Sequence, residues 1–125
     1  MNMSHFAQID ENSIVVNVLV GEEEIFQSGI FGDPKMWIQT SYNTRGGVHY
    51  DPITHQPDGG VALRKNYASV GMIYDPIRDA FYFSKPYSGW LFDEDKCTWY
   101  APIPYPSDGL DYEWDENTQN WKLLI

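Results

Sequence analysis

One pattern occurs three times in the C-terminal half of this chain of 125 residues. An aromatic residue directly precedes an aspartate, and a second aromatic residue follows the aspartate after five intervening positions. The copies are YDPIRDAF (74–81), FDEDKCTW (92–99) and WDENTQNW (114–121). An Asp that begins a turn accepts a hydrogen bond from a backbone N–H two residues on. Each copy therefore predicts a short β-hairpin that places two rings side by side. Ile9-Asp10-Glu11-Asn12 and Tyr50-Asp51-Pro52 are weaker relatives of this turn.

Residues 1–42 predict a hairpin, a short helix and a third strand. Ser4–Asp10 and the β-branched run Ser13–Val20 alternate around a turn signal at Asp10-Glu11-Asn12. A helix is expected near 22–28, because its first turn is acidic and Gly29 follows it. Met36–Tyr42 alternates again and predicts a strand that pairs with the hairpin.

Residues 43–70 differ in character, because Gly46-Gly47, Pro52, Pro57 and Gly59-Gly60 interrupt every regular pattern. They predict an extended arm that is mobile in the monomer and ordered against a partner. The alternative is a loop packed over its own sheet. The whole chain, 1–125, is expected to be a single domain with three parts: 1–42, 43–70 and the three hairpins of 71–125.

The composition supports a mainly β, antiparallel fold with one short helix and aromatic-rich hairpin repeats in the C-terminal half. Aromatic residues make up 16% of the chain, and they favour strands. The net charge of −10 argues against nucleic-acid binding and against anionic membranes as partners. The single cysteine, Cys97, excludes an intrachain disulfide.

No set of residues specifies a chemistry. His49, Asp51 and His55 lie close in sequence, but Pro52 interrupts the strand that would place them on one face. The acidic turns at 93–95 and 115–116 do not match a calcium-binding loop. No Ser-His-Asp or Cys-His set has a recognisable spacing. The sequence therefore predicts no enzyme, no catalytic residue, no metal site and no cofactor.

The candidate partner-binding residues fall into three groups. Arg45, Arg64 and Lys65 are basic residues in an acidic chain, and we expect them to face acidic groups of a partner. Val61, Leu63 and Tyr67 would supply an apolar anchor from the arm. Tyr87, Trp90 and Tyr105 lie near the Pro-rich linkers; with Tyr112 and Trp114 they form either the core of a small domain or a stacking surface for a partner or a sugar.

The segments TSYNTRGGVHYDP and PDGGVALRKNYA, with the run from YDPIRDAF to WDENTQNW, carry a resemblance to small proteins encoded by marine tailed phages, cyanophages especially. The resemblance covers almost the whole chain. It implies a non-enzymatic virion or tail-associated component, made in the host cytoplasm, that binds other virion proteins; self-association is a further expectation. The alternatives are a receptor- or glycan-binding module of a tail fibre, and a host-takeover protein that binds a host factor.

Overall fold

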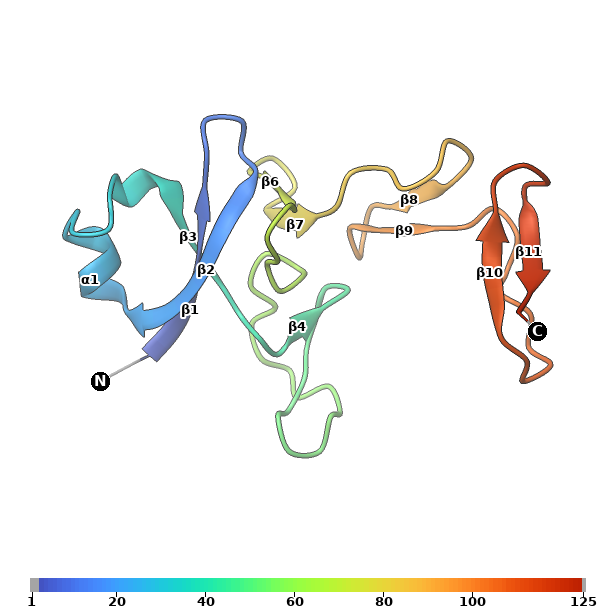
Figure 1. The fold of residues 1–125 in the computed structure, drawn as a ribbon. Coiled ribbons are helices and arrows are strands. Elements are labelled where there is room, and N and C mark those ends of the chain that lie inside the picture. The colour runs from blue at the N-terminus through green and yellow to red at the C-terminus, as the bar shows by residue number, and fades with distance from the viewer. Residues whose placement is uncertain (1–2, 125) are drawn as a thin grey trace.

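The N-terminal part of the molecule is a three-stranded antiparallel sheet in the computed structural model, which describes residues 3–124 (Figure 1). Its strands are β1 (Met3–Ile9), β2 (Val15–Glu22) and β3 (Trp37–Thr40), in the order β2-β1-β3. The carboxylate of Asp10 fixes the turn between β1 and β2, because it accepts hydrogen bonds from the backbone N–H groups of Asn12 (2.8 Å) and Ile14 (3.1 Å). The hairpin and third strand expected in residues 1–42 are confirmed.

One face of this sheet is covered by helical segments. These are the short helix α1 (Glu23–Gln27) and the 3₁₀ turn η1 (Pro34–Met36). The ring of Phe26 in α1 lies 4.4 Å from that of Phe6 and 4.8 Å from that of Trp37, and all three side chains are buried. The short helix expected near 22–28 is confirmed, and Gly29 follows it with φ +86°.

The opposite face is covered by residues from much later in the chain. Successive residues of a strand point to opposite faces, so Ala7 faces away from the Phe6 cluster. Ala7 and Val15 pack against Ala68 and Phe81, and all four are buried. Phe81 belongs to the first hairpin, formed by β6 (Ile73–Asp75) and β7 (Ala80–Tyr82). The N-terminal body therefore includes the first of the three repeated hairpins.

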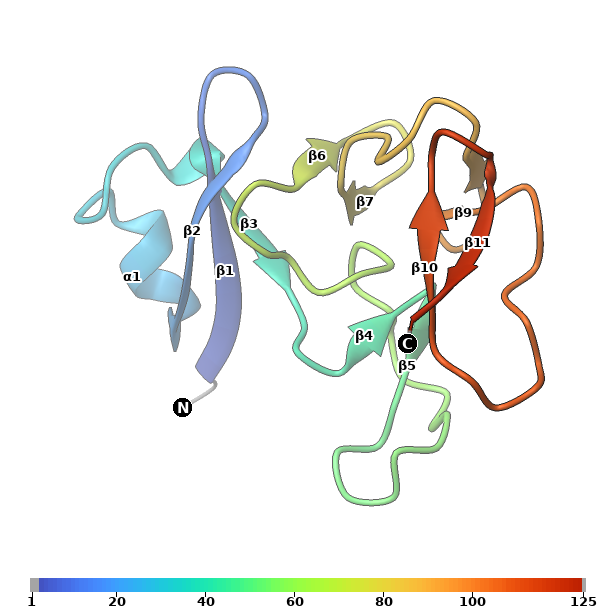
Figure 2. The ribbon, with the colours of Figure 1, turned by 45° about the vertical axis from the view of Figure 1, so that its right-hand side comes forward.

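The segment 43–70, for which the sequence predicts an extended arm, divides into three parts. β4 (Thr44–Arg45) and β5 (Val48–His49) form a tight hairpin around Gly46-Gly47. Residues 51–61 form an almost fully exposed loop that projects from the body (Figure 2). Residues 62–70 return to the sheet and bury Ala68 and Asn66. The longest exposed run is thus 52–61, while residues 62–68 are buried or half-buried and pack on the sheet as a loop over its own body does.

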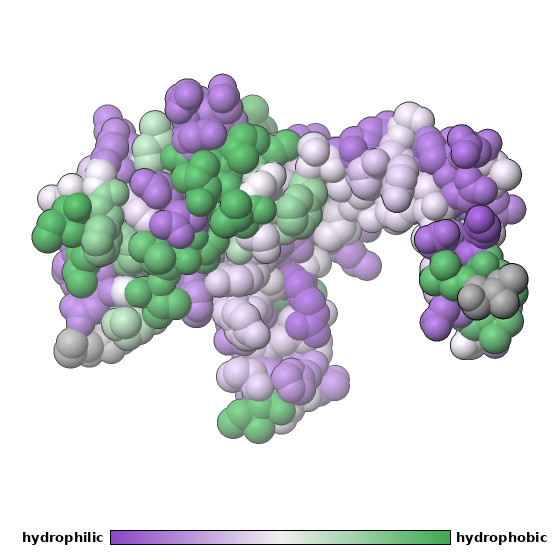
Figure 3. All heavy atoms as spheres, viewed as in Figure 1, coloured by the Kyte–Doolittle hydropathy of each residue, from purple (hydrophilic) through white to green (hydrophobic). Residues whose placement is uncertain are grey.

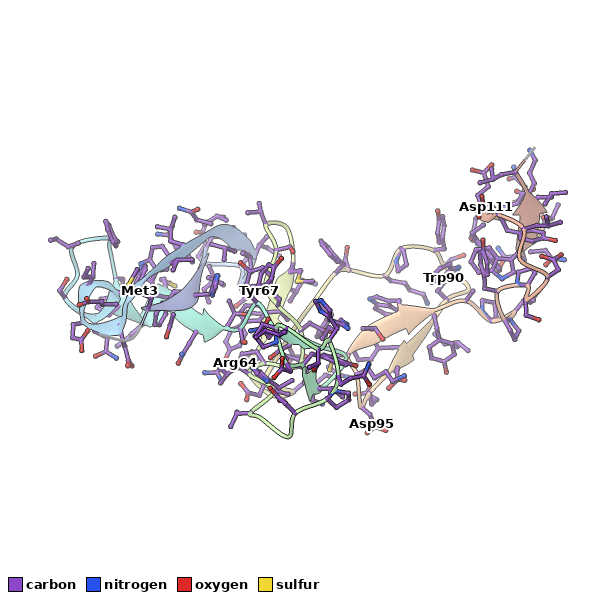
Figure 4. The ribbon with its side chains drawn as sticks, turned by 90° about the horizontal axis from the view of Figure 1, so that it is seen from below. Met3, Arg64, Tyr67, Trp90, Asp95 and Asp111 are labelled. Carbon is purple, nitrogen blue, oxygen red and sulfur yellow. The ribbon has the colours of Figure 1, made fainter. Side chains whose placement is uncertain are left out.

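The rest of the chain is a row of hairpins. The second hairpin consists of β8 (Leu91–Asp93) and β9 (Thr98–Tyr100), and the third of β10 (Tyr112–Asp115) and β11 (Asn120–Leu123). They extend from the body in sequence order, joined by the linkers 83–90 and 101–111 (Figures 1 and 4). Among residues 82–124, Cys97 is the one fully buried residue. The molecule is mainly β, but only its N-terminal body has a core in the ordinary sense.

Candidate protein-binding surface

The three repeated turns have the same backbone structure. Asp75, Asp93 and Asp115 each accept a hydrogen bond from the backbone N–H two residues on, at 3.0 Å in all three turns. The residue four positions after each Asp has a positive φ: 53° at Asp79, 53° at Cys97 and 55° at Gln119. This left-handed residue closes the turn, so the next residue pairs with the Asp across the hairpin.

Each turn places its two rings opposite each other. The centroids are 5.2 Å apart for Tyr74 and Phe81, 4.8 Å for Phe92 and Trp99, and 5.3 Å for Trp114 and Trp121. The prediction that Trp99 packs on Phe92, and Trp121 on Trp114, is confirmed.

A fourth copy of the turn lies in the projecting loop. Asp51 accepts hydrogen bonds from the N–H groups of Ile53 (2.8 Å) and Thr54 (3.0 Å), and His55 has φ 60°. Tyr50 stands before the Asp, but Pro57 takes the place of the second ring and pairs with Tyr50. The loop therefore has the shape of a repeat without its ring pair.

Both later hairpins bind the linker that precedes them. The indole N–H of Trp99 donates to the backbone carbonyl of Phe83 (2.7 Å), and that of Trp121 donates to the carbonyl of Ile103 (2.8 Å). The ring of Tyr105 also lies 5.0 Å from that of Trp121. Each linker is thus fixed against the hairpin that it leads into, which keeps the row ordered without a common core.

The first and second hairpins are joined by a ring contact and an ion pair. The ring centroids of Tyr82 and Phe92 are 4.9 Å apart. Guanidinium nitrogens of Arg78 lie 2.7 Å from a carboxylate oxygen of Glu94 and 2.8 Å from one of Asp75. Hydrogen bonds from the Tyr82 hydroxyl and from Arg78 lower the pKa of Asp75 to about 2. The Arg78 contact likewise lowers the pKa of Glu94.

The third hairpin is held mainly by linker 83–90 rather than by the second hairpin. The ring centroid of Trp90 lies 5.7 Å from that of Trp114 and 6.2 Å from that of Trp121. The Ser88 hydroxyl donates a hydrogen bond of 2.9 Å to the Glu116 carboxylate. Hydrogen bonds from Trp114, and then from Gln119 and Ser88, lower the pKa of Glu116.

The predicted partner-binding aromatics therefore gather around the third hairpin. Tyr87 and Trp90 contact Trp114, and Tyr105 contacts Trp121. Tyr105 is 50% exposed and Tyr87 39%, whereas Trp90 is half-buried. Each of these aromatics packs on a neighbouring ring and also leaves part of its surface exposed. They therefore combine the two predicted roles, the core of a small domain and a stacking surface.

The predicted basic residues make contacts within the chain. The Arg45 guanidinium lies 3.8 Å from the centroid of the Tyr50 ring. Arg64 Nε is 3.2 Å from the Asp79 carboxylate, and Lys65 donates to the backbone carbonyl of Glu94 at 3.2 Å. Intramolecular groups thus meet the charges of Arg64 and Lys65, which the sequence assigned to a partner.

The predicted apolar anchor is dispersed. Val61 is 76% exposed in the projecting loop, and Leu63 is half-buried where the chain returns. Tyr67 packs edge-on against His5 and Tyr42 at the sheet (Figure 4). These three residues do not form one surface.

A buried asparagine that the sequence analysis missed connects the body to the hairpins. Asn66 Oδ1 accepts from the N–H of Gly46 at 2.8 Å. Its Nδ2 lies 3.1 Å from the carbonyl oxygen of Phe81, 3.0 Å from that of Lys96 and 3.1 Å from that of Cys97. One side chain thereby joins the β4–β5 turn and the first and second hairpins. An isolated Asn in a loop has no spacing signal that would reveal this role.

A groove of about 380 Å³ lies beside this junction. Its walls are mainly apolar and aromatic; they include Met72, Tyr82, Phe83, Pro86, Trp90 and Trp99. The groove follows linker 83–90 between the first two hairpins, and its chemistry suits an apolar side chain.

No family model, no curated protein and no solved structure matches this chain.

The described residues offer neither a metal-binding cluster nor a helix that could span a membrane. Within residues 3–124, no group of three or more His, Cys, Asp or Glu side chains is placed to hold a metal ion. His49 Nδ1 lies 2.7 Å from Asp58, while Asp51 accepts bonds within its own turn. None of the helices in the described part of the chain has the length and apolar character needed to cross a membrane.

Proposed function

We propose that this protein is a non-enzymatic structural component of a phage particle that binds other proteins of the particle through its aromatic hairpin row. The observation that carries the proposal is the near absence of a core in residues 83–124, among which only Cys97 is fully buried. A segment this rich in aromatics commonly gains stability by burial, either in a core or in an interface. Here the rings are stacked along a surface.

The exposed rings have the composition of an interface. Tyr87, Tyr100 and Tyr105 are each at least 39% exposed, and Leu110 and Leu123 add apolar area near the C-terminus (Figure 3). Tyrosine and tryptophan carry much of the binding energy at protein interfaces, because they bury large area with few rotatable bonds. The place in a phage particle comes from the sequence resemblance, which the aromatic hairpins themselves carry.

Mass spectrometry of purified particles tests the location. The chain should be present in gradient-purified particles of the phage that encodes it, at a constant ratio to the major structural proteins. Its presence in infected cells and absence from particles would overturn the proposal and favour binding to a host factor.

Variants of the exposed rings test the surface. Tyr87→Ser and Tyr105→Ser together should abolish incorporation into particles, while slow amide hydrogen exchange in β10 and β11 should show that the Trp114–Trp121 pair keeps the third hairpin closed. Ile77→Ser is the matched control, because Ile77 is 95% exposed at the tip of the first hairpin and outside this surface. Incorporation that survives the double change would exclude these rings as the binding surface.

Glycan binding is the second candidate function. Its specific support is the position of the exposed Tyr105 and Tyr87 rings beside hydrogen-bonding side chains at the third hairpin: Ser88, Asp108, Glu116 and Gln119. A glycan array probed with the isolated chain distinguishes the two functions. Binding that is lost in the same double variant would favour the glycan.

A further inference from the structure

The contact between the first and second hairpins defines a set of matched positions. Counted from the turn Asp, the first hairpin contributes the residue three positions later, Arg78, and the residue seven positions later, Tyr82. The second hairpin contributes the residues directly before and after its own Asp, Phe92 and Glu94.

The second and third hairpins have the same kinds of residue at these positions. Lys96 and Tyr100 of the second hairpin correspond to Arg78 and Tyr82, while Trp114 and Glu116 of the third correspond to Phe92 and Glu94. All four positions retain their chemistry: a cation, a tyrosine, an aromatic ring and a glutamate. The second hairpin is therefore equipped to bind the third as the first hairpin binds the second.

The structure does not join these residues. Tyr100 is 49% exposed, and Leu91, which pairs with it across the hairpin, is 48% exposed. Within residues 3–124, no carboxylate lies within ion-pair distance of Lys96. The matching pair in the first hairpin, Ile73 and Tyr82, is half-buried.

The partner that the repeat predicts is engaged elsewhere. In the third hairpin, Trp90 packs on Trp114 and the Ser88 hydroxyl bonds Glu116, so linker 83–90 takes the role of the second hairpin. This arrangement buries the indole N–H of Trp90 without an acceptor, although Trp99 and Trp121 both have one. A buried donor without a partner is unfavourable, so an arrangement that gives the Trp90 N–H an acceptor or exposes it to water would gain free energy.

We infer that Leu91 and Tyr100, together with the ammonium group of Lys96, whose stem lies beside Gly46, form a docking surface for the third hairpin of a second copy of this chain. Lys96 pairs there with Glu116 and Tyr100 packs on Trp114, as Arg78 pairs with Glu94 and Tyr82 packs on Phe92. Linker 101–111 is longer than linker 83–90, so it can carry the third hairpin across to a neighbour. Two copies that exchange third hairpins form a closed symmetric dimer.

The inference concerns the chain alone and does not rest on its place in a phage particle. Sedimentation equilibrium over a wide range of protein concentration should show a monomer–dimer equilibrium. Lys96→Glu and Glu116→Lys should each weaken dimerisation by more than about tenfold, because like charges then meet in both contacts. Lys85→Glu and Glu11→Lys make the same charge changes at exposed positions outside the contact, and should leave the equilibrium unchanged.

Mixing the two single variants gives the decisive result. In an equimolar mixture, one contact of the mixed dimer joins the two substituted side chains and the other joins the unchanged Lys96 and Glu116. Both contacts again join opposite charges, so dimers should return. For the same reason, dimers should also return in the double variant Lys96→Glu/Glu116→Lys. This rescue separates a lost contact from a third hairpin that no longer folds. A wild-type chain that stays monomeric at every concentration overturns the inference, as does a dimer that both single variants retain, or a loss that neither mixture nor double variant reverses.

Discussion

At the scale of single residues, Asn66 holds three separate segments of the chain together. Its amide group contacts four backbone groups in three segments that lie up to 31 positions from Asn66 in the sequence. An amide suits this role because it donates on one side and accepts on the other. The two amide protons are shared among three backbone carbonyl oxygens here. A shorter side chain, or a carboxylate that cannot donate, therefore leaves these buried carbonyl groups unpaired.

Replacing Asn66 with Ala should therefore cost about 2–4 kcal/mol of the free energy of unfolding, because several buried groups lose their partners together. Urea denaturation followed by tryptophan fluorescence measures the loss. Asn17→Ala is the matched control: Asn17 is exposed in β2, and its loss should change the free energy of unfolding by less than about 0.5 kcal/mol. Equal effects of the two changes would contradict the role of Asn66.

Asp75 predicts a pH dependence. Its pKa in the folded protein is about 2, below the ordinary value of 3.8. A group with a depressed folded pKa stabilises the fold above its unfolded pKa and loses that contribution as the pH falls through the folded value. The contribution is thus complete above about pH 4 and declines toward pH 2.

Asp75→Asn should lower the free energy of unfolding at pH 7 by about 1–2 kcal/mol, because the hydrogen bonds from Tyr82 and Arg78 lose their charged acceptor. Thermal unfolding at pH 7, 4 and 2 measures how the difference between the two proteins changes. The difference should be largest at pH 7 and smallest at pH 2. A constant difference would show that Asp75 does not titrate as described.

At the scale of elements, the repeated hairpins could be predicted because the information is local. The turn Asp, its spacing to both rings and the flanking strands lie within eight residues, and local hydrogen bonds fix the turn. The left-handed position could not be read in the same way, because Asp79, Cys97 and Gln119 share no residue type.

The packing of residues 62–70 could not be predicted, because it depends on partners far away in the sequence. Ala68 fits under the sheet beside Phe81, and its N–H donates to the Thr40 hydroxyl at 3.0 Å. The run has few large apolar residues, so its composition indicates an exposed loop. Residue type alone was enough to identify the candidate aromatics. How much of each ring is buried could not be predicted, because it depends on the path by which linker 83–90 reaches the third hairpin.

Trp121→Ala should open the third hairpin without unfolding the body. Trp121 is half-buried and contacts Trp90, Trp114, Tyr105 and the Ile103 carbonyl, none of which belongs to residues 3–82. Amide hydrogen exchange measures the effect residue by residue: exchange in β10 and β11 should accelerate, while exchange in β1 and β2 stays unchanged. Leu124→Ala, an exposed change in the same region, should alter neither. Faster exchange throughout the sheet would contradict an independent third hairpin.

At the scale of the whole molecule, the projecting loop holds the longest continuous run of exposed residues within residues 3–124, from 52 to 61. Val61 and Ile53 are 76% and 85% exposed there, and thermolysin cleaves before large apolar residues. The Gly46-Gly47 turn is protected, because Gly46 N–H bonds Asn66 and Gly47 N–H bonds the Lys65 carbonyl.

Brief thermolysin digestion of the wild-type chain should therefore cut first within residues 51–61, and mass spectrometry of the fragments locates the cut. The variant Val61→Gly should lose cleavage at that bond and keep any cleavage before Ile53. A first cut at Gly46-Gly47, or at the short hairpin tip where the Asp75 carboxylate holds the N–H groups of Ile77 and Arg78, would contradict the expectation that the longest exposed run is cut first.

The linkers of the hairpin row have a consequence for how such a molecule changes over evolutionary time. The turn Asp residues are 18 positions apart from Asp75 to Asp93 and 22 apart from Asp93 to Asp115. The second and third hairpins are each bound by the preceding linker, and the third also packs on linker 83–90, so a unit of one linker and one hairpin brings part of its contacts with it and takes the rest from the unit before it. Duplication or loss of such a unit beyond Tyr100 would lengthen or shorten the reach of the protein by a fixed step, while the folding of residues 3–82 would remain the same. Natural variants of this design are therefore expected to differ in reach by whole units rather than by single residues.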